Sequence, residues 1–149
     1  QNVDNLKKTP FDLQIRNELL LASNKAGLAF SNTKTAAAHS ISYPLTINYG
    51  IPHGIASSLS LEPILNINAN LITKEIDIIC KNLNFSFEDL KRKIKDIPDK
   101  IIPFKLNHWG VKRDHLKKLV KESFTKGRMD NNIVNLDHDD VYQILRSIY

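Results

Sequence analysis

Apolar residues recur at helical spacing along most of this chain of 149 residues. Near the start, Phe11, Ile15, Leu19 and Ala22 follow one another at three- and four-residue steps, as residues on one face of a helix do. No segment shows a clear alternation of apolar and polar residues, the pattern that indicates a half-buried strand. The length suits one ordinary domain. The sequence therefore predicts an all-α helical bundle that forms a single domain over residues 1–149.

The helix boundaries can be predicted from prolines and capping residues. Ser86 and Asp89 have the spacing of a capping box, and Asp137 is a suitable first cap for the last helix. Pro44 should end or kink the second helix, because its ring clashes with the carbonyl four residues back. We expect helices at residues 10–30, 33–43, 55–61, 64–71, 73–83, 86–97, 111–125 and 137–148.

The charge of the chain is positive and unevenly distributed. The net charge is +5, and residues 91–128 hold thirteen Lys and Arg against four Asp and Glu. Such a stripe is typical either of the solvated face of amphipathic helices or of a binding module for nucleic acid or another anionic partner. We favour the solvated face and expect no nucleic-acid partner, because no aromatic residues interleave the basic ones and no known nucleic-acid motif is present.

Composition also indicates the compartment. The longest apolar run covers only a few residues, so we expect no membrane span. Cys80, the one cysteine, lies at helical spacing among isoleucines and leucine, which predicts a buried, inert thiol in a reducing cytoplasm. The chain starts at Gln1 without a leader pattern, so we expect it to be a fragment of a longer protein.

Two of the five histidines lie in unusual surroundings. His39 follows three alanines, and His53 lies between a proline and a glycine where a loop becomes a helix. On one unbroken helix their fourteen-residue separation would span about 21 Å. Pro44, Gly50 and Pro52 break that helix, so both rings can turn toward one metal ion, although on spacing alone two histidines in a helical protein are more often unrelated. We expect structural roles for the remaining histidines, His108, His115 and His138.

Several short segments resemble the C-terminal domain of the iron-containing (group III) alcohol dehydrogenases. They are Ala-Gly-Leu-Ala-Phe at 26–30, Ala-His at 38–39, and Tyr-Gly-Ile-Pro-His-Gly-Ile-Ala at 49–56. The tail Arg-Met-Asp-Asn-Asn at 128–132 is similar to the end of the same family, so the resemblance covers nearly the whole chain.

The resemblance implies a metal-dependent, NAD(P)-linked alcohol dehydrogenase or aldehyde reductase acting on a small aldehyde or alcohol. His39 and His53 match two of the family's metal ligands, and an upstream Asp-x-x-x-His pair, absent here, supplies the others. The metal would be Fe(II) or Zn. NAD(P)H would bind the protein's own N-terminal nucleotide-binding domain, and the full protein would be a homodimer. The fragment alone should be inactive, because it carries neither that domain nor a Gly-rich phosphate loop.

The resemblance assigns two further residues. Tyr43 occupies a position near nicotinamide and substrate where many members carry histidine, so it is a candidate catalytic group, with helix packing as the alternative. Phe30 matches an aromatic residue that lines the nicotinamide pocket, with core packing as the alternative. The run Ile-Ser-Tyr-Pro-Leu-Thr at 41–46 is similar to the phosphonoacetaldehyde reductases within the family.

Overall fold

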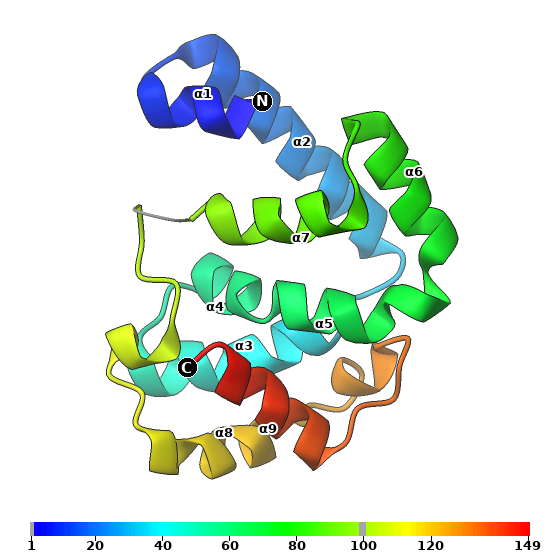
Figure 1. Ribbon diagram of the computed structural model, residues 1–149. Coiled ribbons are helices and arrows are strands. Elements are labelled where there is room, and N and C mark those ends of the chain that lie inside the picture. Colours follow the sequence, from blue (N-terminus) through cyan, green and yellow to red (C-terminus); the bar gives the residue numbers. More distant parts are fainter. Residues whose placement is uncertain (1, 99–100) are drawn as a thin grey trace. The chain divides into compact units, whose positions relative to one another are not determined.

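The computed structural model describes residues 2–98 and 101–149 and consists of helices and connecting loops in that part of the chain (Figure 1). The predicted all-α class is confirmed, because none of the described residues forms a strand. The α-helices and 3₁₀-helices (η) are, in order, α1 Asn2–Lys8, α2 Leu13–Ser31, α3 Ala37–Tyr49, α4 His53–Leu59, α5 Leu61–Asn68, η1 Ala69–Leu71, α6 Thr73–Leu83, α7 Phe87–Asp96, η2 Leu106–Trp109, η3 Arg113–His115, α8 Leu116–Glu122, η4 Met129–Asn131 and α9 His138–Ser147.

The chain divides into two compact units, Gln1–Lys34 and Thr35–Tyr149. The first unit holds α1 and α2, and the second holds every helix from α3 onward. That a single domain spans residues 1–149 stays a prediction.

In the first unit, the predicted helix over residues 10–30 begins later than expected and is preceded by an unpredicted helix, α1. Asp12 caps α2, since its carboxylate accepts hydrogen bonds from the backbone N–H groups of Gln14 and Ile15 at 2.9 and 3.0 Å. The apolar stripe is only partly covered: Ile15 and Leu19 are half-buried, and α2 has no fully buried residue. Capping by Asp12, rather than Pro10 in the first turn, sets the start of the helix.

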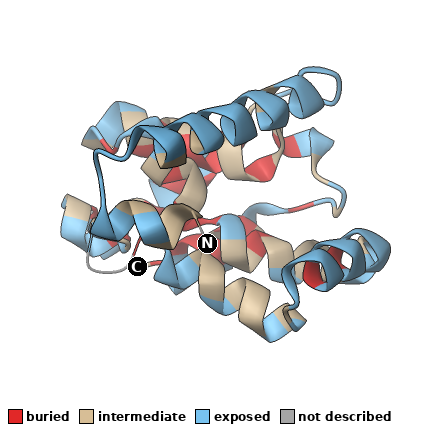
Figure 2. Cartoon of the chain, turned by 90° about the horizontal axis from the view of Figure 1, so that it is seen from above, coloured by how far each residue is buried: buried red, intermediate tan, exposed pale blue. Residues whose placement is uncertain are grey.

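The core of the second unit is formed by α3, α8 and α9 together with shorter segments. Figure 2 colours the chain by how far each residue is buried. Ile41 and Leu45 of α3, Leu116 and Leu119 of α8, and Leu145 of α9 are each at most 1% exposed. Helices α8 and α9 lie side by side, and α3 contacts α8 (Figure 1). These side chains fix the position of α3, the helix that carries His39.

Helix α3 continues through Pro44 to Tyr49, so the predicted boundary at residue 43 is wrong, and the alternative, that Pro44 kinks the helix, stays a prediction. A proline inside a helix costs about 3 kcal/mol. Ile41 and Leu45, which flank the proline and are both 0% exposed, stabilise the helix by roughly 1.5–3 kcal/mol each through burial. Packing of α3 into the core therefore outweighs the local cost of the proline. The N-terminal end also differs, since α3 begins at Ala37 rather than at residue 33.

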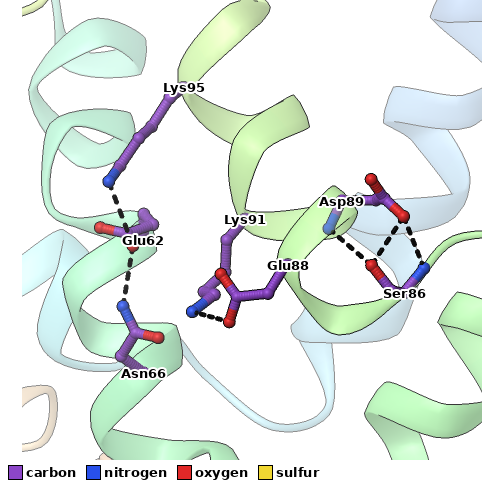
Figure 3. Close-up of polar contacts among 7 residues, drawn as sticks. All are labelled: Glu62, Asn66, Ser86, Glu88, Asp89, Lys91 and Lys95. Atoms are coloured by element: carbon purple, nitrogen blue, oxygen red, sulfur yellow. Dashed lines mark hydrogen bonds and ion pairs between the residues drawn. The ribbon is translucent and has the colours of Figure 1, made fainter.

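The predicted capping box of α7 is confirmed (Figure 3). The Ser86 hydroxyl accepts a hydrogen bond from the backbone N–H of Asp89 at 3.1 Å, and the Asp89 carboxylate accepts one from the backbone N–H of Ser86 at 3.0 Å. An ion pair of 3.3 Å between Lys95 and Glu62 links α7 to α5, and Asn66 donates to the same carboxylate at 2.8 Å. Asp137 caps the last helix, α9, as expected, and with Asp140 it forms a second capping box that was not predicted.

The basic residues of α8 lie opposite its buried face. Lys117, Lys118 and Lys121 are exposed, whereas Leu116 and Leu119 are buried. This arrangement is that of a solvated face on an amphipathic helix. Among the described residues, no helix combines the length and the apolar character that crossing a bilayer requires.

Candidate metal and substrate site

The site is built at the turn between α3 and α4. Helix α3 ends at Gly50, whose φ of 64° is the left-handed conformation that favours glycine, and its N–H donates to the carbonyl of Thr46 at 3.0 Å. Ile51 is fully buried, Pro52 is the N-cap, and His53 is the first residue of α4. The reversal of chain direction predicted for residues 44–52 therefore occurs entirely within residues 50–52.

This turn brings the rings of His39 and His53 together. Their centroids are 5.3 Å apart, and the ring planes are inclined by 56°. Imidazole nitrogens bind divalent metals at about 2.1 Å, which puts the ion about 3.2 Å from each centroid. Two rings meeting at a tetrahedral angle then have centroids about 5.2 Å apart. The observed separation fits two ligands of a single ion, although no group of three or more metal-ligating side chains occurs among the described residues.

The environment of His39 favours the form that binds metal. Partial burial lowers the pKa of His39 below its ordinary value, and the charges of His53 and Arg128 lower it further. The ring is therefore neutral at neutral pH, as a metal ligand must be. His53, in contrast, is exposed at the start of its helix and remains accessible from solvent.

Ser42 orients the second ring. Its hydroxyl, which is fully buried, donates to the carbonyl oxygen of His39 at 2.7 Å and lies 3.3 Å from Nδ1 of His53. A serine hydroxyl has one proton, so toward His53 its oxygen acts as the acceptor of the Nδ1–H. The neutral ring then has Nε2 unprotonated and available to a metal.

Tyr43 and Arg128 extend the site beyond the histidines. The ring of Tyr43, one helical turn after His39, stacks on His53 with centroids 5.9 Å apart and planes inclined by 17°. The guanidinium carbon of Arg128 lies 4.9 Å from the centroid of Tyr43, in a cation–π contact. A continuous row of side chains in contact is therefore formed by four residues: His39, His53, Tyr43 and Arg128.

The loop that carries Arg128 is anchored by the residues that follow the arginine. Met129 is 6% exposed and belongs to the core. Asn132 and Asn68 exchange side-chain amide hydrogen bonds of 3.0 and 3.1 Å, and Asn131 donates to the carbonyl of Thr35 at 3.1 Å. These contacts explain why methionine and asparagines follow the arginine in the 128–132 segment.

The other histidines and the cysteine lie apart from this row. Nδ1 of His115 is hydrogen-bonded to the hydroxyl of Tyr49 at 2.8 Å, and His138 stacks on Phe124 with centroids 4.2 Å apart. These contacts support the structural roles expected for both, which stay predictions. Cys80 is buried and unpaired, as expected.

Comparison with known proteins decides the family. The model of the Fe-containing alcohol dehydrogenase family, C-terminal, matches residues 1–149. The chain belongs to the iron-containing alcohol dehydrogenase family. The resemblance inferred from residues 26–30, 38–39 and 49–56 is thus confirmed at the level of the family.

Individual relatives cover the chain but are themselves longer. A 4-hydroxybutyrate dehydrogenase of Clostridium kluyveri is 25% identical over 96% of the chain, which spans 41% of that relative. Long-chain-alcohol dehydrogenase 1 of Geobacillus thermodenitrificans is 29% identical over 79% of the chain and 32% of its own length. The solved alcohol dehydrogenase from Oenococcus oeni has the same fold, with a TM-score of 0.85 and 20% identity over 97% of the chain and 40% of its own. The chain spans about two fifths or less of these family members.

Within the family's C-terminal domain, sequence reasoning singled out His39, His53 and Tyr43, and the structure places these three side chains together. Phe30 lies on α2, in the first unit, and is half-exposed there. Its role at the nicotinamide stays a prediction. Arg128 stood out from the sequence only as one of the basic residues and as part of the family-like tail, without a role, and Ser42 had no role either. A signal for Arg128 was available in its own segment, 128–132, which resembles the family.

Proposed function

We propose that this chain is the metal- and substrate-binding part of an NAD(P)-linked alcohol dehydrogenase that interconverts small aldehydes and primary alcohols. The observation that carries the proposal is the pair of imidazoles 5.3 Å apart in a chain of this family. The named activities of the relatives, among them 4-hydroxybutyrate and long-chain-alcohol dehydrogenases, support the reaction class. A phosphonoacetaldehyde substrate, a cytoplasmic location and a homodimeric assembly are further parts of the proposal.

His39 and His53 would hold the ion, together with an aspartate and a histidine from outside this chain. When bound, a divalent iron or zinc ion supplies Lewis-acid stabilisation of charge on the substrate oxygen, and NAD(P)H supplies the hydride. Ser42 keeps the ring of His53 in the required tautomer through its contact with Nδ1. The exposed position of His53 leaves access for the substrate.

Tyr43 is the proposed catalytic group. Its ring stacks on His53, so its hydroxyl projects from the same side of α3 as the two histidines. A phenol O–H can donate a hydrogen bond to the substrate oxygen or to a water molecule that relays the proton. Phe30 is the proposed contact with the nicotinamide.

The test uses the complete enzyme with substitutions at the two proposed ligands. His39→Ala and His53→Ala should each reduce the iron or zinc content to less than about one-tenth of the wild-type content, because each removes a ring nitrogen that would bind the ion. Oxidation of NADH or NADPH in the presence of short aldehydes should be lost in parallel. Metal analysis of the purified proteins measures the first effect, and absorbance at 340 nm measures the second.

His108→Ala is the matched control, since His108 is exposed and lies on η2, a different element from those that carry His39 and His53. The control should keep both metal and turnover. Wild-type metal content in either His39→Ala or His53→Ala would refute the site assignment.

A further inference from the structure

Arg128 is a half-buried cation for which the described part of the chain provides no counter-ion. Its guanidinium packs on the Tyr43 ring at 4.9 Å, and none of the ion pairs between described residues includes it. By contrast, Arg92 pairs with Asp89. A charge that is partly withdrawn from water without a partner is unfavourable, and binding of an anion would offset that cost.

The position of Arg128 is fixed rather than adaptable. The residue that follows it, Met129, is buried in the core, and the paired amides of Asn132 and Asn68 hold the end of the same segment. The ring of Tyr43 packs against one face of the guanidinium. A cation–π contact uses the face of the guanidinium and leaves its N–H edges free to donate.

The same ring links Arg128 to the proposed reaction centre. Tyr43 stacks on His53 at 5.9 Å, and His53 lies 5.3 Å from His39. A short molecule whose reacting oxygen approaches the two imidazoles would therefore extend along Tyr43 toward the guanidinium. Two parallel N–H groups of the guanidinium match the spacing of two oxygens of a carboxylate, phosphonate or sulfonate group.

We propose that Arg128 binds the anionic end of the substrate, so that the preferred substrate is a short aldehyde carrying a terminal carboxylate, phosphonate or sulfonate. This inference rests on the proposed function for the identity of the reacting end, but binding of the anion itself does not depend on turnover. Arg128 is thus the residue that sets specificity, while Tyr43 both supports it and faces the reacting group.

The first experiment measures anion binding to the complete enzyme by isothermal titration calorimetry. The probes are butyrate, methylphosphonate and methanesulfonate, with butanamide as the neutral reference. Arg128→Gln should weaken binding of the best anion about 10- to 100-fold, because charge-assisted hydrogen bonds are lost. Arg128→Lys should weaken binding less than Arg128→Gln does, since lysine keeps the positive charge but lacks the two parallel N–H donors. The ranking of the three probes identifies the oxyacid.

Lys126→Gln is the matched control. It removes an equal charge two residues away, at an exposed position, and should leave the anion affinity unchanged. An equal loss in Lys126→Gln and Arg128→Gln would show an effect of net charge alone and would overturn the proposal. Unchanged affinity in a folded Arg128→Gln protein, with native melting temperature, would overturn it as well.

The second experiment separates this proposal from the proposed function. Reduction of 4-oxobutanoate is compared with reduction of butanal, which has the same chain length without the charge. In Arg128→Gln the ratio of kcat/KM for the charged aldehyde to that for the neutral one should fall about 100-fold. An unchanged ratio would contradict the assignment of Arg128. If the wild-type enzyme reduces no aldehyde, the proposed function fails, and the calorimetric result decides the role of Arg128 by itself.

Discussion

Ser42 affects the proposed metal site through its contact with the ring of His53. Its buried hydroxyl is shared between the carbonyl of His39 and Nδ1 of His53, at 2.7 and 3.3 Å. Partners of this kind fix the tautomer of a ligating histidine, and their loss typically costs 10- to 100-fold in metal affinity. We therefore expect Ser42→Ala to weaken metal binding by about tenfold or more, measured by competition with a chelator.

A second serine serves as the control for this prediction. Ser58 lies one turn into α4, and its hydroxyl donates to the carbonyl of Gly54 at 2.7 Å, away from both rings. Ser58→Ala should keep the wild-type metal affinity. If Ser42→Ala also keeps it, the hydroxyl does not orient His53.

At the residue scale, the sequence supports prediction where a side chain and its local context are both distinctive. His39 and His53 stood out through the alanines, prolines and glycines around them, and Tyr43 through the family resemblance. Arg128 lies 85 residues beyond Tyr43 in the sequence, so no local pattern can indicate their contact. Its place became apparent only when the fold brought the 128–132 segment against α3.

At the scale of helices, capping chemistry is a more reliable guide than proline. The boxes at Ser86 and Asp137 place the first turns of α7 and α9 correctly, because each box satisfies otherwise free N–H groups within the same turn. Helix α3 does not end before Pro44, because its stability depends on burial against residues far away in the sequence, which a local rule for proline does not include. Local rules therefore succeed where the stabilising contacts are themselves local.

The capping box of α7 gives a prediction at this scale. Ser86→Ala should destabilise the first turn of α7 by about 1 kcal/mol, which corresponds to roughly fivefold faster amide exchange there. Hydrogen–deuterium exchange on the complete enzyme measures the effect. The bonds from Ser86 lower the pKa of Asp89, so the box is intact above the ordinary carboxyl pKa of 3.8 and is lost as the pH falls further.

Exchange in α9 provides the internal reference for this experiment, since its own capping box at Asp137 is untouched. Its protection should be the same in wild type and Ser86→Ala. Equal protection of α7 in the two proteins would show that the box contributes nothing to the stability of that helix.

At the scale of the whole molecule, the second unit positions every residue of the row from His39 to Arg128. The all-α class could be predicted from helical periodicity. The division into two units could not, because the apolar stripe along α2 looks like that of a core helix, whereas the helix has no fully buried residue. The chain spans about two fifths or less of the relatives compared, and we expect the remaining metal ligands and the nucleotide from outside it.

The central claim is that His39 and His53 bind one and the same metal ion. A crystal structure of the complete protein, with anomalous diffraction measured at the iron and zinc absorption edges, tests it most directly. We expect one anomalous peak within about 2.2 Å of a ring nitrogen of each histidine. A metal peak that contacts only one of these rings, or neither, would contradict it.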